Sequence, residues 1–191
     1  MIDAQRDEVI DATRSWLEKA VIGLNLCPFA KAVHVKGQIR YAVSAAQTQD
    51  ELLQDLVHEL KYLAAADPGD IDTTLLIHPF ALADFLDVAD AALGELALTG
   101  EIQIASFHPR YQFAGTRPDD IENYTNRSPY PILHLLREES IERGMAAFPD
   151  AAQIFEKNID TLTRLGHEGW SKLDVGAPSV RDAPGSRTAK D

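Results

Sequence analysis

The sequence has only one cysteine, Cys27, among its 191 residues. A single thiol excludes a disulfide within the chain and any metal site built from several cysteines. Long apolar runs are also missing: none approaches the ~20 residues that a membrane helix requires, and the polar first eight residues predict no signal peptide. We therefore expect a cytoplasmic protein that does not bind membranes.

Positive charge is scarce. Lysine and arginine total 18 against 30 acidic residues, which gives a formal net charge of -12. Such a surface repels phosphate backbones, and no basic stripe offsets it, so we expect no nucleic-acid partner. The phosphate-binding loop, the dinucleotide-binding glycine motif, the nucleophile elbow of hydrolases and the His-Glu-x-x-His zinc motif are all missing, which argues against those enzyme classes.

The hydrophobic content, 45%, is ordinary for a globular domain. Apolar residues at three- and four-residue steps predict helices, and alternating or continuous short apolar runs predict strands. The predicted helices are 3–24, 49–63, 82–96 and 149–165, and the predicted strands are 39–43, 73–78 and 102–107. This order predicts an α/β fold with a small, mostly parallel sheet of about three strands, flanked by helices, with extra N-terminal and C-terminal helices.

One segment has two competing interpretations. Ser128 followed by two prolines can open a helix that continues to Gly144, whereas 131–136 also reads as a short apolar strand, which would be a fourth. From 171 onward, small, polar and charged residues dominate. We therefore expect one α/β domain over 1–170 and a disordered tail over 171–191.

The segment 106–134 is unusually rich in reactive side chains, with two His, three Arg, three Tyr and four Pro. A long connection inside a compact domain costs conformational entropy, so it commonly serves a function. This segment is the predicted site.

Two histidines, His78 and His108, each follow a predicted strand and precede a proline. Loops that leave the carboxyl ends of parallel strands gather at one edge of a sheet, where α/β proteins bind ligands. We expect His108 to be the acid/base residue, with His78 assisting. The alternative is that each His-Pro pair merely ends a strand.

Arginines are concentrated within or just after the same segment. Guanidinium groups grip carboxylates and phosphates in two places, and Ser128 adjoins a predicted helix N-terminus. We therefore predict that Arg110, Arg127, Ser128 and Arg137 bind an anion. Alternatively, the arginines pair with nearby carboxylates and hold the segment together.

Cys27 supports two hypotheses besides that of a small buried residue. It is a catalytic nucleophile if a neighbouring group stabilises its thiolate. It is a metal ligand, for zinc or another transition metal, if Cys27, His78, His108 and His134 converge. The spacing of these four residues matches no compact metal motif.

Three segments carry a resemblance to a known family. Leu26-Cys-Pro-Phe-Ala30, Ser106-Phe-His-Pro-Arg-Tyr-Gln-Phe113 and the thirteen residues from Asn126 to Glu138 resemble segments of the bacterial family labelled domain of unknown function 1415. The likeness spans roughly residues 7 to 170. It implies a bacterial cytosolic protein and implies no mechanism.

Two functions remain open at this point. The first is an enzyme that binds a small anionic metabolite at the His/Arg-rich segment, with or without Cys27 or a metal. The second is a non-catalytic ligand-binding or scaffold module in which the same arginines and histidines are structural.

Overall fold

A computed structural model describes residues 3–80, 86–147 and 153–176. Its centre is a four-stranded sheet in the order β1-β2-β4-β3. The strands are β1 (Ile39–Val43), β2 (Thr73–Ile77), β3 (Ile102–Phe107) and β4 (Ile132–Arg137). β1 and β2 are parallel, and β4 runs antiparallel to both of its neighbours. The predicted α/β class is therefore confirmed.

The prediction of a mostly parallel, three-stranded sheet is wrong. The fourth strand is the segment that the sequence left between helix and strand, and Ile132, Leu133 and Leu135 on it are almost completely buried. The expected helix start at Ser128 is absent, because the Ser128 hydroxyl donates to the Tyr130 carbonyl instead and the helix α5 begins only at Glu138. Because β4 returns antiparallel to β3, the two strands need no helical crossover between them, and the connection is a loop.

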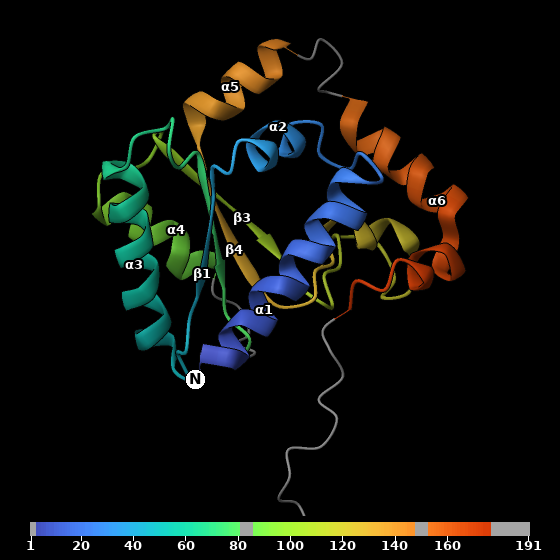
Figure 1. The fold of residues 1–191 in the computed structure, drawn as a ribbon, viewed down its shortest axis with the longest axis horizontal. Coiled ribbons are helices and arrows are strands. Elements are labelled where there is room, and N and C mark those ends of the chain that lie inside the picture. Colours follow the sequence, from blue (N-terminus) through green and yellow to red (C-terminus); the bar gives the residue numbers. More distant parts are fainter. Residues whose placement is uncertain (1–2, 81–85, 148–152, 177–191) are drawn as a thin grey trace, which may run out of the picture.

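Helices α3 (Gln49–Ala65) and α4 (Leu86–Glu95) cover one face of the sheet (Figure 1). A capping box begins α3: Glu51 N donates to Thr48 Oγ1 over 3.2 Å, and Thr48 N donates to Glu51 Oε2 over 3.1 Å. The leucine stripe of α3 packs against Leu76 and Leu133 of the sheet. Of the predicted helix 82–96, residues 82–85 lie outside the described residues.

Helix α1 (Asp3–Trp16) covers the opposite face and continues as a π-helical turn, η1 (Leu17–Ile22). Trp16 and Ala20 pack there against Ile77 and Ile132. A short helix, α2 (Ala30–Val35), follows in a segment for which the sequence predicted neither helix nor strand. No helix among the described residues is long and apolar enough to cross a membrane.

The connection between β3 and β4 contains a 3-10 helix, η2 (Ile121–Asn126), on which α6 (Ile154–Lys172) packs. We call residues 108–131 the rim loop. The chain stays ordered past the predicted tail boundary at 171: Val175 is 5% exposed and packs with the α1 cluster. Residues 177–191 of the predicted tail, and 149–152 of the predicted last helix, lie outside the described residues.

Candidate functional site

His78 and His108 lie at the same edge of the sheet. β2 and β3 both run antiparallel to the strand between them, so their carboxyl ends meet at one rim. His78 N donates to the Pro131 carbonyl over 3.0 Å, and His108 N donates to the Asn126 carbonyl over 3.1 Å. The rim loop therefore holds both histidines where each strand ends.

Both imidazoles are held neutral near pH 7. Burial lowers the pKa of His78 to about 4, and the nearby His108 contributes in the same direction. The pKa of His108 is also lowered, by partial burial first and by Arg110 second. Each effect disfavours the charged ring. His108 thus acts on the pKa of His78 from the end of β3, two strands away from β2 in the sheet.

Their ring nitrogens are in different situations. His108 Nδ1 accepts a hydrogen bond from Arg110 N over 3.0 Å, so in the neutral ring the proton sits on Nε2. The ring of His78 is buried, and its Nδ1 has no hydrogen-bond partner among the described residues. A buried polar atom without a partner is costly, and such atoms are commonly found where a ligand or water binds.

Of the predicted anion-binding arginines, two are engaged by the protein itself. Arg127 donates to the carbonyls of Tyr111 and Pro118, and its guanidinium lies 4.2 Å from the ring centroid of Tyr124. Arg137 donates to three main-chain carbonyls around the end of α3, those of Leu63, Ala66 and Ile71. Ser128, likewise, has its hydroxyl hydrogen-bonded to a carbonyl.

Arg110 differs from these. It is exposed, and its guanidinium makes no hydrogen bond or ion pair with any residue that the structure describes. Its charge nevertheless acts on His108. Among the predicted anion ligands, Arg110 is therefore the one placed at the rim with its donors available.

Cys27 lies away from an activating group. It packs against the α1 side of the core, and burial raises the pKa of its thiol, an effect that the Phe29 and Ala30 amides only partly offset. No histidine or arginine contributes to that pKa. A buried neutral thiol is a poor nucleophile.

His134 lies within β4 rather than at the rim. Its Nε2 is 2.8 Å from Thr73 Oγ1, and burial lowers its pKa to about 4. Within the described ranges, no three His, Cys, Asp or Glu side chains are grouped so that they could hold a metal ion. The prediction of a zinc site formed by Cys27, His78, His108 and His134 gains no support from this arrangement.

A residue that the sequence reasoning missed, Asn123, braces the rim loop. It is fully buried, its Oδ1 accepts from Phe113 N over 2.9 Å and from Thr116 Oγ1 over 2.8 Å, and its Nδ2 donates to the Arg117 carbonyl over 2.7 Å. No sequence signal distinguishes it from Asn126, the other asparagine of the segment. Its three bonds fix the loop's shape.

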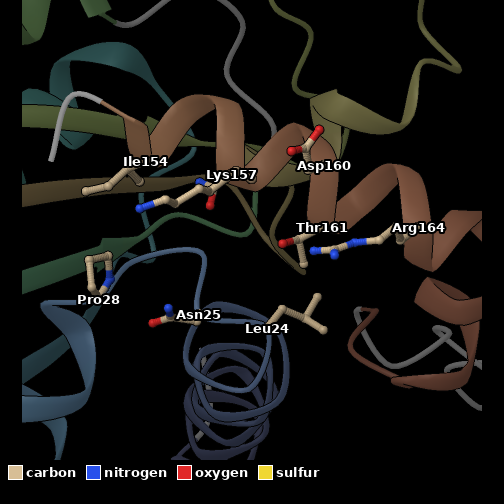
Figure 2. Close-up of a pocket in the computed structure, with 9 residues that line it drawn as sticks. Leu24, Asn25, Pro28, Ile154, Lys157, Asp160, Thr161 and Arg164 are labelled. Atoms are coloured by element: carbon tan, nitrogen blue, oxygen red, sulfur yellow. The ribbon is translucent and has the colours of Figure 1, made fainter. Parts of the chain in front are cut away.

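Two cavities lie elsewhere on the molecule. One, of about 310 Å³, separates α6 from the turn at 24–28 (Figure 2). The other, of about 550 Å³, lies between α2, the turn at 68–69 and α5. Neither is lined by His78 or His108.

Comparison with known proteins identifies the family. No curated protein and no solved structure matches the chain. A family model described as "Protein of unknown function (DUF1415)" matches residues 8–172, most of the chain and all of the sheet. The resemblance seen in the sequence is thereby confirmed, and the chain belongs to this family.

Proposed function

We propose that the protein is an enzyme that binds a small anionic metabolite at the rim formed by His78, His108 and Arg110. The observation that carries this proposal is the placement of His78 and His108 at one edge of the sheet, at the ends of β2 and β3, with the pKa of each ring lowered. Paired titratable groups with perturbed pKa values at the carboxyl edge of a sheet are typical of catalytic sites.

His108 is the acid/base residue in this proposal. It is only partly buried, so a ligand can reach it, and its neutral ring can accept a proton at pH 7. Because Nδ1 already accepts the Arg110 amide, the exchangeable proton is the one on Nε2. In this arrangement the ring meets a ligand as a hydrogen-bond donor at Nε2, and it accepts a proton as a base only when it gives up the hydrogen bond from the Arg110 N–H.

His78 and Arg110 have supporting roles. The guanidinium of Arg110 attracts the anionic group and favours bidentate contact with a carboxylate or phosphate. The buried Nδ1 of His78 has no hydrogen-bond partner among the described residues. It is therefore available to hydrogen-bond the ligand or a water and so to orient it. Arg127 and Arg137 are assigned to holding the protein together, because main-chain carbonyls occupy their guanidinium groups.

The rival function is a non-catalytic binding or scaffold module. The bracing of the rim loop by Asn123 and Arg127 favours it, because a rigid loop presents a fixed surface. The same rigidity also suits an enzyme, which needs its groups preorganised. The two functions differ in the role of His108: in an enzyme it transfers a proton to or from the bound ligand, whereas in a binding module the ligand is left unchanged.

A turnover experiment separates them. The purified protein is incubated with a pool of small carboxylates and phosphate esters, and mass spectrometry follows the depletion of each compound. An enzyme depletes at least one compound, and the His108→Gln variant loses that activity while Arg117→Gln, which removes a charge that is 88% exposed in the same loop, keeps it. Binding of a compound without conversion by the wild type would favour the module and contradict the enzyme.

A further inference from the structure

A second part of the molecule, remote in sequence from the rim loop, has the features of a ligand site. Helix α6 and the turn at 24–28 enclose the cavity of about 310 Å³ shown in Figure 2. Cavities of roughly 300–1,000 Å³ are typical of small-molecule sites. Its described lining includes Asn25, Pro28, Lys157, Thr161 and Arg164.

Three polar side chains of α6 line one side of this cavity. Lys157, Thr161 and Arg164 follow one another at steps of four and three residues, which places them on one face of the helix. Figure 2 shows all three extending into the gap between α6 and the turn, whereas the carboxylate of Asp160 points away from it. Two positive side chains thus face the cavity of a protein whose formal net charge is -12.

The guanidinium of Arg164 makes no hydrogen bond or ion pair with any residue in the described ranges. Other arginines are engaged: Arg40 forms a 2.6 Å ion pair with Glu59, and Arg143 pairs with Glu139. Arg164 consequently retains its planar set of donors, which matches the oxygens of a carboxylate or phosphate. On the opposite wall, Asn25 lines the same cavity, with its side-chain amide directed away from Arg164 (Figure 2).

The two walls of the cavity are fixed to each other. Asn158 is 5% exposed, and its Nδ2 donates to the Leu26 carbonyl over 2.9 Å, so that α6 is tied to the turn. Asn25 adopts the left-handed conformation, with φ of 55°, which asparagine tolerates better than most residues. The cavity is therefore held open by a buried hydrogen bond rather than by a chance approach of two surfaces.

From these observations we infer that this cavity binds a small molecule carrying an oxyanion, a carboxylate or a phosphate group. Arg164 grips the anion in two places, and the Thr161 hydroxyl, one helical turn away, donates a further hydrogen bond. The inference is independent of the rim: none of these residues belongs to the rim loop, and neither His78 nor His108 lines the cavity.

The experiment uses the full chain and two probes, inorganic phosphate and succinate. The Arg Nε–H resonances are followed by NMR during each titration, and that of Arg164 is identified by its absence in Arg164→Gln. We expect at least one probe to shift the Arg164 resonance in a saturable manner. Arg164→Gln should weaken binding of that probe about tenfold or more, as measured by calorimetry, because a charge-assisted hydrogen-bond pair is lost.

Two controls keep the outcome specific to this cavity. Lys172→Gln removes the same charge from the same helix, at an exposed ion pair with Glu168, and should leave the affinity unchanged. His108→Gln should also leave it unchanged, so that failure of the rim proposal and failure of this one are distinguishable. A response to phosphate alone or to succinate alone identifies the anionic group. The inference is overturned if neither probe shifts the Arg164 resonance at millimolar concentration, or if Arg164→Gln binds as the wild type does.

Discussion

The indole Nε1 of Trp16 donates a hydrogen bond to the main-chain carbonyl of Arg127, 2.8 Å away, across 111 residues of sequence. Trp16 is 2% exposed at the end of α1, and Arg127 lies in the rim loop directly before the segment that enters β4. The bond ties the first helix to the loop that carries His108 and Arg110. The geometry of the rim therefore depends on a residue far from it.

Replacing Trp16 by phenylalanine should lower the free energy of unfolding by about 1–3 kcal/mol, because the Arg127 carbonyl loses its donor and the smaller ring leaves space beside Phe107. Urea unfolding followed by circular dichroism measures this. Arg14→Gln, an exposed change on the same helix, is the control and should alter stability little. Equal stability of Trp16→Phe and the wild type would mean that the bond does not tie α1 to the loop.

Asn123→Ala should be more damaging than Asn126→Ala. Asn123 makes three side-chain hydrogen bonds from a fully buried position, whereas Asn126 Nδ2 makes one, of 3.3 Å, to the Ser106 carbonyl. Because each buried partner left without a bond costs about 1–3 kcal/mol, the melting temperature should fall by several degrees more in Asn123→Ala. The opposite order would show that the loop is braced elsewhere.

Replacement of Arg127 and of Arg110 should have different effects on the free energy of unfolding, measured by urea unfolding. Arg127→Ala removes donors to the Tyr111 and Pro118 carbonyls and the contact with the Tyr124 ring, so it should destabilise the fold by about 1–3 kcal/mol. Arg110→Ala removes no such bond and should change stability by less than about 0.5 kcal/mol. If Arg110→Ala were the more destabilised variant, Arg110 would be structural and the rim proposal would lose its anion-binding residue.

Stability should fall in acid partly through His78. Its pKa drops from an ordinary 6.5 to about 4 on folding, so between these values the unfolded chain binds the proton and the folded chain does not. The contribution of His78 to the free energy of unfolding is thus complete above pH 6.5 and is lost as the pH falls toward 4. The loss amounts to about 3 kcal/mol at most. Unfolding free energies measured at several pH values across this window should show a shallower slope in His78→Gln than in the wild type, whatever the variant's absolute stability. Identical slopes would contradict a buried neutral His78.

Much of the fold follows from local patterns in the sequence. Hydrophobic periodicity predicts the apolar stripe of α1, the leucines of α3 and the first three strands, because each pattern lies within a short stretch of sequence. The capping box of α3 is likewise a local motif. The direction of a strand is not local. Whether β4 returns antiparallel between β2 and β3 depends on contacts of Leu133 and Leu135 with both neighbouring strands, and a short apolar run is compatible with helix or strand until those contacts are known.

The site was predictable in part for the same reason. His78 and His108 end strands, and strand ends converge whichever way the central strand runs, so their placement at one rim follows from the pattern. The roles of the arginines do not, because Arg110, Arg127 and Arg137 look alike in sequence. Only the carbonyls that converge on Arg127 and Arg137 distinguish a structural arginine from an available one.

The most direct test of the rim site is an NMR titration of the histidine rings, recorded with and without inorganic phosphate. We expect the pKa values of His78 and His108 both to lie below the ordinary 6.5 in the free protein. We also expect phosphate to shift the His108 resonances and to raise the pKa of His108, and Arg110→Gln to remove this response. Ordinary pKa values for both rings, with no response of His108 to phosphate, would contradict the proposal that this rim is an anion-binding catalytic site.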